Sequence, residues 1–273
     1  DTVIDEEVGY VLDLGVEFRR GQRIDSMAAL MQEGWDAVFV GSGAPRGRDL
    51  DIPGRREAAA HIHIGIDWLS SVSFGHVDRI GKRVVVLGGG NTAMDCCRSA
   101  RRLGGESVHV VVRSGFDEMK ASPWEKEDAM HEGIPILNFL VPKSFGISFD
   151  KVAPRYDDKG RRELVPTGEP EVRFDCDVVL VAVGQENSFP WIERDLGIEF
   201  DKWDVPKIGE KTFESTRPGV FFGGDSAFGP KNIIWAVEHG HQAAISIHKH
   251  CQGESVESRL PDGMNLQTSK MGM

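Results

Sequence analysis

Cysteine is scarce in this sequence. The 273 residues contain four, Cys96, Cys97, Cys176 and Cys251, and none of them forms a C-x-x-C pair. This spacing excludes the usual zinc and iron–sulfur patterns within the chain and offers no disulfide framework. A reducing, cytoplasmic setting is therefore predicted. The neighbouring Cys96 and Cys97 are predicted to be small core residues.

Clusters of metal ligands are also missing from the sequence. His61 and His63 would share one strand face, and His248 and Cys251 are three residues apart. Neither pair supplies the three or four converging ligands that a metal site needs, so no metal is predicted.

Long apolar runs and excess positive charge are absent as well. No run reaches transmembrane length, and the sequence contains no signal-peptide pattern. The net charge of -11 disfavours nucleic acid or an anionic membrane as partner. The sequence opens on a helical pattern without an initiator Met, which we interpret as truncation of a longer chain.

The most informative stretch of the sequence is KRVVVLGGGNTAMD, residues 82–95. Residues 84–87 predict a strand buried on both faces, and a helical pattern follows the glycines. Gly88 permits a sharp turn, Gly90 lets a pyrophosphate approach the backbone, and Ala93 lets the helix pack closely. The start of the helix would then present free N–H groups to the phosphates. The predicted dinucleotide contacts here are Gly88, Gly90, Asn91, Thr92 and Ala93.

A second strand completes a strand–helix–strand unit. It is predicted over Ser107–Val112 and ends at Arg113. NAD-specific sites often carry an acidic residue at this place, whereas an arginine suits the 2′-phosphate of NADP. We therefore expect NADP(H) as the nucleotide, with NAD(H) as the alternative. The purely structural alternative is a solvated arginine at a strand end.

The remaining pattern predicts an α/β protein. Helices are expected over 2–14, 27–32, 122–131 and 231–250, the third with a Ser122–Glu125 capping box after the motif helix. Further strands are expected over 16–18, 35–40, 61–66, 134–140, 177–183 and 219–222. Short β-prone runs within 143–175, around the turn 157–160, predict an antiparallel meander.

Four segments together resemble a known family: GGGNTAMD, the strand ends GSGA and AVGQ, and GVFFGGDSAFGPKNIIWAVEHG. They are similar to two-dinucleotide-binding flavoprotein reductases, above all to the small (β) subunit of glutamate synthase and to NADPH:ferredoxin oxidoreductase-type subunits. The resemblance implies a Rossmann-like NAD(P)H domain, residues 78–188, inserted in a partial FAD domain of similar design. The FAD domain would comprise 1–77 and 189–250, followed by a C-terminal extension, 251–273.

The resemblance also implies cofactors and function. FAD and NADP(H) would bind, hydride would pass between them without a catalytic side chain, and electrons would leave to a partner subunit or iron–sulfur centre. The implied FAD contacts are Gly41, Gly43, Gly224, Asp225, Asn232, Ile233 and Ile234, and the implied further NAD(P)H contacts are Gly184 and Gln185. Gly41 and Gly43 would look the same as plain turn glycines, and Asp225 the same as a helix-capping or turn aspartate.

Two departures from the family pattern leave an alternative open. No G-x-G-x-x-G lies upstream of Trp35, and no cysteine cluster for iron–sulfur centres is present. The alternative is a non-catalytic nucleotide-binding or assembly module with an incomplete FAD site. A thioredoxin reductase-type enzyme is disfavoured, because its C-x-x-C is missing from 78–188.

Overall fold

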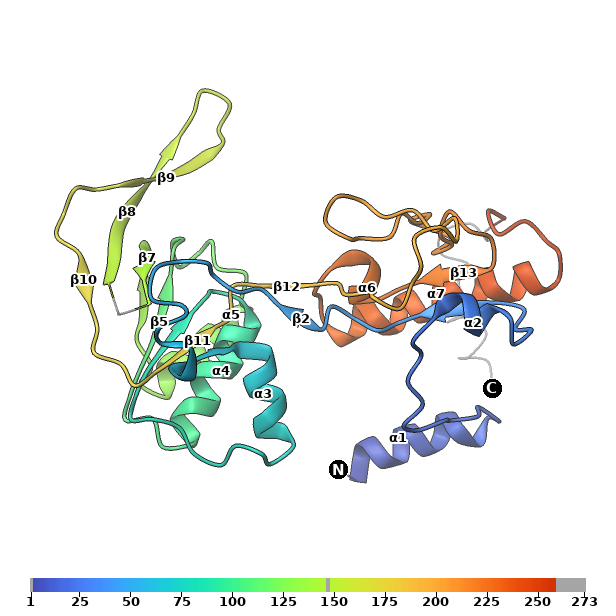
Figure 1. Cartoon of the computed structure of the whole chain (residues 1–273), viewed down its shortest axis with the longest axis horizontal. Coiled ribbons are helices and arrows are strands. Elements are labelled where there is room, and N and C mark those ends of the chain that lie inside the picture. Colours follow the sequence, from blue (N-terminus) through green and yellow to red (C-terminus); the bar gives the residue numbers. More distant parts are fainter. Residues whose placement is uncertain (1, 146–147, 259–273) are drawn as a thin grey trace. The chain divides into compact units, whose positions relative to one another are not determined.

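The computed structural model describes residues 2–145 and 148–258, and the predicted extension beyond 258 lies outside them. The chain divides into two compact units, and each is described by itself. Unit 1 comprises Asp1–Val40, Phe189–Gly223 and Glu238–Met273, and unit 2 comprises Gly41–Ser188 and Gly224–Val237. Figure 1 shows the elements of both units.

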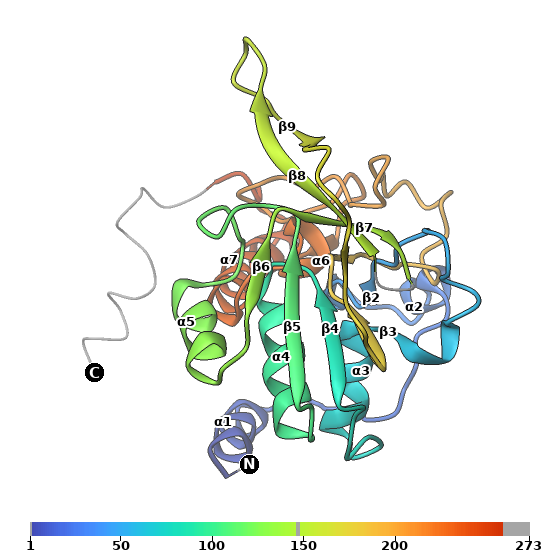
Figure 2. The ribbon, with the colours of Figure 1, turned by 90° about the vertical axis from the view of Figure 1, so that its left-hand side faces the viewer.

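Unit 2 is built on a five-stranded parallel sheet of order β3-β11-β4-β5-β6. Figure 2 shows β4, β5 and β6 of this sheet side by side. This sheet and its helices confirm the α/β class. The strands are β3 (Ile62–Ile64), β11 (Val178–Val181), β4 (Arg83–Leu87), β5 (Ser107–Val112) and β6 (Ile136–Asn138). The helices of this part of the unit are α3 (Gly65–Ser73), α4 (Asn91–Arg102) and α5 (Pro123–His131), with a 3-10 turn, η1 (Ala59–His61).

Side chains that alternate along the strands form two separate cores. Val84 and Val86 of β4 pack with residues of α3, α4 and α5 in one cluster. Val85 and Leu87 pack on the other face, with Phe145 and its neighbours in a second cluster. Because successive strand residues point to opposite faces, a continuous apolar run such as that of β4 requires cover on both sides.

The predicted meander is confirmed and covers the second face. It consists of β7 (Leu140–Ser144), β8 (Ser148–Tyr156), β9 (Arg162–Pro166) and β10 (Val172–Arg173), in antiparallel pairs. The β8–β9 hairpin projects from the sheet (Figures 1 and 2).

A short ladder within unit 2 was not predicted. β2 (Arg46–Gly47) and β12 (Gln185–Glu186) pair antiparallel, and Arg46 Nε donates to Glu186 Oε1 at 2.7 Å. Two residues per strand give no detectable periodicity, so only the pairing partner identifies this element.

Unit 1 contains β1 (Val38–Val40) and β13 (Val220–Phe222), which pair in parallel. Phe189 and Phe222 form its aromatic core, with ring centroids 5.8 Å apart at 85°. The other helices of the chain are α1 (Thr2–Asp13), α2 (Met27–Met31), α6 (Asp225–Phe228) and α7 (Ile233–Cys251). As predicted, the Ser26 hydroxyl caps α2 by accepting from the Ala29 N–H at 3.0 Å. α1 has no buried residue.

Three local predictions are wrong. Residues 16–18 form no strand, because no neighbouring strand pairs with them within the described chain. The last helix was predicted to end at His250, but α7 runs on through Cys251. Ser122 occupies the N-cap of α5 without a side-chain cap bond, because Asn91 binds its hydroxyl and Glu125 pairs with Arg98.

The division into units differs from the predicted domain borders at two places. Residues 224–237, predicted within the second FAD segment, belong to unit 2. The border at Ser188 coincides with the predicted one, but the first border falls at Val40 rather than residue 77. The reason is that β3 pairs with β11, so this segment belongs to the parallel sheet. The assignment of segments to FAD and NAD(P)H domains stays a prediction.

Candidate functional site

The turn between β4 and α4 can be made only by glycine at its first position. Gly88 has φ of +139°, and a Cβ on it would lie 2.1 Å from the carbonyl oxygen of Ala182, just beyond β11. Its N–H donates to the Val111 carbonyl of β5 at 3.1 Å. The turn is therefore seated between two neighbouring strand ends, in a backbone conformation that side chains rarely adopt.

The rest of the turn presents open polar backbone. Gly90 is the N-cap of α4 and has no side chain to cap the helix, and a Cβ on it would meet no atom within 4 Å. The N–H groups of Asn91 and Thr92 donate to no acceptor in residues 2–145 and 148–258. Ala93 is fully buried, which lets α4 approach the sheet. Unpaired N–H groups at a helix start form an anion site.

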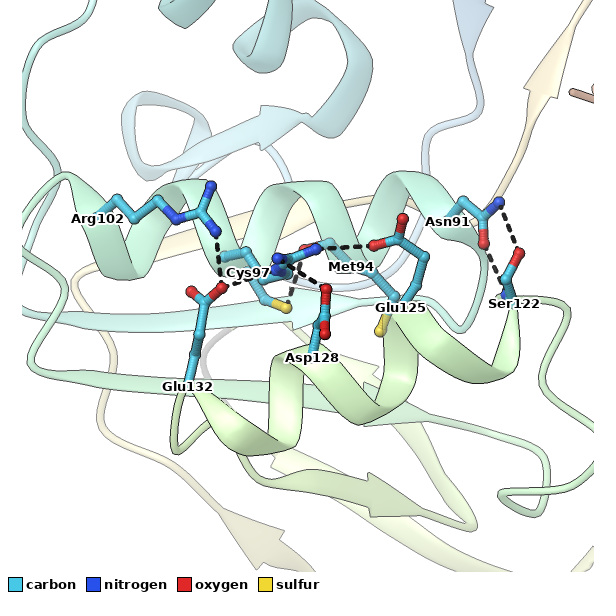
Figure 3. Close-up of polar contacts among 9 residues, drawn as sticks. Asn91, Met94, Cys97, Arg102, Ser122, Glu125, Asp128 and Glu132 are labelled. Carbon is cyan, nitrogen blue, oxygen red and sulfur yellow. Dashed lines mark hydrogen bonds and ion pairs between the residues drawn. The ribbon is translucent and has the colours of Figure 1, made fainter. Parts of the chain in front are cut away.

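The Asn91 side chain is used within the protein. Its Oδ1 accepts from the Ser122 N–H at 2.8 Å, and its Nδ2 donates to the Ser122 hydroxyl at 3.4 Å (Figure 3). The Ala121 N–H also donates to the Gly89 carbonyl at 3.0 Å. These bonds tie the start of α5 to the glycine turn, so Asn91 can offer a nucleotide its backbone N–H rather than its amide.

An arginine fastens α4 to α5. Arg98 contacts Glu125 at 2.9 Å, Asp128 at 3.0 Å and Glu132 at 2.8 Å, and Figure 3 shows these carboxylates along α5. Arg102 also pairs with Glu132. Burial alone would raise the pKa of Glu132, but the hydrogen bonds and charges of Arg98 and Arg102 outweigh it and lower that pKa.

Arg98→Ala is expected to destabilise the protein by roughly 1–3 kcal/mol, because it leaves three carboxylates facing α4 without this cation. Arg102→Ala, the matched control, removes a side chain that is 62% exposed and should have a much smaller effect.

The stabilising contribution of Glu132 is complete above its unfolded-state pKa and is lost as pH falls through the lowered folded-state pKa. Urea unfolding of the variants at pH 7 and in acid measures both effects; equal losses for the two variants would contradict the role of Arg98.

Arg113 lies at the end of β5, beside β4 in the sheet. Its side chain is exposed and forms no ion pair with any part of the chain that the structure describes. The loop that follows it is braced by three elements. Asn138 Nδ2 donates to the Ser114 carbonyl at 2.8 Å, Lys126 Nζ to the Phe116 carbonyl at 3.0 Å, and Glu118 pairs with Arg162.

The braces of this loop were not found from the sequence. Lys126 is only 7% exposed, and its ammonium lies 4.3 Å from the Phe116 ring centroid. A lysine in a polar helix pattern is typical of a solvated face, so no local signal marks it. Only the packing of α5 against the loop shows that the charge is buried and bonded.

Gly184 follows β11, the strand next to β4 in the parallel sheet. Its φ is +133°, and its carbonyl accepts from the Arg48 N–H at 2.9 Å. Gln185 is half-buried and pairs with Gly47 in the short ladder. Gly184, Gly88 and Arg113 thus follow the neighbouring strands β11, β4 and β5. Ligands of open parallel sheets bind outside such carboxyl ends.

The residues predicted for FAD include several with structural tasks. Gly43, after β1, has φ of +74° and open space around it. Gly224 is the N-cap of α6 with φ of +62°, and Asp225 Oδ1 accepts from the Lys231 N–H at 3.0 Å. That bond across the loop between α6 and α7 agrees with the turn alternative for Asp225, while its second oxygen has no such bond among the residues described.

The start of α7 agrees with the expected helix start. Asn232 Oδ1 accepts from the Trp235 N–H at 3.1 Å and so caps the helix. Ile233 and Ile234 follow and are 82% and 78% exposed. An apolar pair at this exposure next to a helix N-terminus is suited to contact a flat ligand, and a role of these residues in FAD binding stays a prediction.

The cysteines and histidines form no reactive centre in the described ranges. Cys96 and Cys97 are fully buried, as predicted, and burial raises the pKa of Cys96 and takes that of Cys97 to about 12. Within 2–145 and 148–258, no three His, Cys, Asp or Glu side chains are grouped to hold a metal. No helix in these ranges is long and apolar enough to cross a membrane.

The parallel sheet and the glycine turn at its carboxyl edge define a dinucleotide-binding type of fold. The model of the pyridine nucleotide-disulphide oxidoreductase family matches residues 14–240, and the chain belongs to this family. The resemblance drawn from the sequence is thereby confirmed.

Curated relatives within this family show which of its members the chain is similar to. It is 34% identical over 267 residues to the small chain of NADPH glutamate synthase from Halomonas elongata, covering 89% of this chain and 54% of that one. It is 31% identical over 280 residues to the β subunit of NADP(+)-dependent formate dehydrogenase from Moorella thermoacetica, covering 98% and 39%. The chain thus spans about half or less of these relatives' lengths.

Solved structures share the fold. FprA from Mycobacterium tuberculosis in complex with NADPH matches with a TM-score of 0.62 and 18% identity, covering 82% of this chain and 66% of that one. Thioredoxin reductase from Lactococcus lactis matches with a TM-score of 0.59 and 24% identity, covering 80% and 66%.

Proposed function

We propose that this chain is a module of an NADPH-dependent flavin oxidoreductase similar to the glutamate synthase small subunit. It binds NADPH on unit 2, serves hydride transfer to FAD, and passes electrons on to a partner subunit or iron–sulfur centre. The names of the two curated relatives support this proposal, because both include NADP(H) and both describe one subunit of a larger enzyme.

The observation that carries the proposal is the geometry of the β4–α4 turn. Gly90 leaves space for a phosphate, and the N–H groups of Asn91 and Thr92 have no acceptor among the described residues. Arg113, a cation without an ion-pair partner in the described chain, follows the adjacent strand. A pyrophosphate at the turn and a 2′-phosphate at Arg113 would satisfy both sets of groups.

The residues proposed for FAD suit its flavin half rather than its pyrophosphate. FAD, when bound, would supply the hydride acceptor, so no side chain needs to act as acid or base. The second oxygen of Asp225 can accept a sugar hydroxyl, and the N-terminus of α7 favours negative charge close to it. Ile233 and Ile234 offer apolar contact area that excludes water.

Purified alone, this chain is expected to retain little FAD and to lack NADPH-dependent diaphorase activity. The reason is that no G-x-G-x-x-G upstream of Trp35 is available to hold the FAD pyrophosphate. Losing several charge-assisted hydrogen bonds costs several kcal/mol of binding free energy, and each loss of about 1.4 kcal/mol weakens binding tenfold. The measurement is flavin absorbance near 450 nm, with and without an N-terminal extension that carries a G-x-G-x-x-G strand–turn–helix.

Restoration of FAD and diaphorase activity by the extension supports the proposed function. Stoichiometric FAD on the chain alone would contradict the need for that turn but not the function. If the extended protein binds NADPH and still takes up no flavin, the non-catalytic binding module is the correct interpretation.

A further inference from the structure

A cavity of about 720 Å³ lies within unit 2, at the free edge of the parallel sheet. Its walls come from edge strand β3, helix α3, the segment 77–81 and the first residue of β11, Val178. Gly81 lies two residues before β4 begins, so the cavity is at the opposite end of that strand from Gly88. It is therefore separate from the proposed nucleotide site.

The walls of this cavity are fixed by hydrogen bonds. The N–H groups of His76 and Val77 donate to the Ser71 carbonyl of α3 at 2.8 and 3.2 Å. The Ile80 N–H donates to the Leu103 carbonyl at 3.2 Å. The segment 77–81 is thus tied to both α3 and the end of α4, which gives the cavity a defined shape.

The lining combines an apolar body with two cations. The apolar residues are Ile62, Ile64, Trp68, Val77, Ile80 and Val178. Arg55 bonds Asp49 through Nε at 2.9 Å, which fixes the guanidinium and leaves its two Nη groups without a bond in the described ranges. Arg79 forms no ion pair with the residues described, and Asp67 is the one carboxylate in the lining.

Trp68 adds a second, independent observation. It is 5% exposed and lines the cavity, and its indole N–H donates to no acceptor within 2–145 and 148–258. A buried tryptophan N–H usually has a hydrogen-bond partner, because leaving one unmade is costly. No residue in the described ranges supplies an acceptor for the Trp68 indole N–H.

We propose that this cavity is a binding site for a small organic anion with an apolar body and one carboxylate or phosphate group. Its size is that of ordinary small-molecule sites, which are mostly apolar with a few polar groups that fix orientation. The apolar body packs on Trp68 and the isoleucines. The anionic group binds the guanidinium groups of Arg55 and Arg79, whose planar forks match carboxylate and phosphate oxygens. The site is independent of the proposed electron-transfer function.

The test uses indole signals in the ¹H–¹⁵N NMR spectrum of the whole chain, which has six tryptophans. The Trp68 signal is assigned with Trp68→Phe. 3-Phenylpropionate and phenyl phosphate are titrated separately to distinguish the two headgroups, and 3-phenylpropionamide is the uncharged control. A saturable shift of the Trp68 signal by either anion is expected, with the amide binding about ten- to a hundredfold more weakly.

Arg79→Ala should weaken the anion by a similar factor, since it removes one of the two cations. The side chain of Arg79 is exposed, so the variant should fold normally. Arg56→Ala is the matched control, because that exposed arginine does not line the cavity. The proposal is overturned if neither anion shifts the Trp68 signal up to about 10 mM, a range in which even weak specific binding is visible. It is equally overturned if acid and amide, or wild type and Arg79→Ala, bind alike.

Discussion

Gly88→Ala is expected to disrupt unit 2, with a loss of about 3 kcal/mol or more in the free energy of unfolding. The new Cβ would lie 2.1 Å from the Ala182 carbonyl oxygen, and the φ of +139° would be strained for any side chain. The atoms that would clash belong to the backbone, so relief requires the strand ends β4 and β11 to separate. Circular dichroism with urea or heat measures the loss.

Gly90→Ala is the matched variant, and the opposite pattern is expected for it. Its Cβ would meet no atom within 4 Å, and its backbone, φ −101° and ψ 176°, suits alanine. Stability should therefore change by no more than about 1 kcal/mol. NADPH affinity should fall about tenfold or more, because the methyl group occupies space where a pyrophosphate would approach the backbone. Calorimetric titration with NADPH measures this, and unchanged affinity would show that the phosphates bind elsewhere.

Arg113→Ala is expected to weaken NADPH binding about ten- to a hundredfold and to leave NADH nearly unchanged. The physical reason is a charge-assisted contact of roughly 1.5–3 kcal/mol to the 2′-phosphate, which NADH lacks. The side chain has no ion pair in the described part of the chain, so its loss should leave the fold intact. The measurement is the ratio of the two dissociation constants.

Arg20→Ala controls for the loss of one positive charge. This arginine is exposed between α1 and α2 and forms no ion pair with other described residues. It should leave the ratio of NADPH to NADH affinity unchanged, apart from a small, salt-dependent effect. A parallel loss of both nucleotides in Arg113→Ala would refute the assignment of cofactor preference to this residue.

Local sequence was sufficient for the central strand–helix–strand unit. An apolar run, three small residues at fixed spacing and a second apolar run each favour the same structure, so β4, α4 and β5 form where predicted. The same holds for the Ser26 cap and the Asn232 helix start, because a capping side chain acts within three residues. The prediction from local sequence failed for residues 16–18. Their composition is strand-like, but no strand of the described chain pairs with them.

Contacts between distant residues were decided only in three dimensions. Asn91 was predicted as a nucleotide contact, but its amide is held by Ser122, and Lys126 is buried against a loop ten residues earlier. The cavity beside Trp68 depends on how β3, α3 and 77–81 meet.

The sequence by itself determined the family, the α/β class and the glycine turn, because these depend on periodicity and on residues close in the chain. The tertiary structure alone decided why Gly88 cannot change, through the carbonyl of Ala182, 94 positions away in the chain. It also decided which charged side chains form ion pairs, as Arg98 does, and which have no ion-pair partner within the described chain, as is true of Arg113. Pairing of side chains depends on the packing of whole elements, which no local pattern specifies.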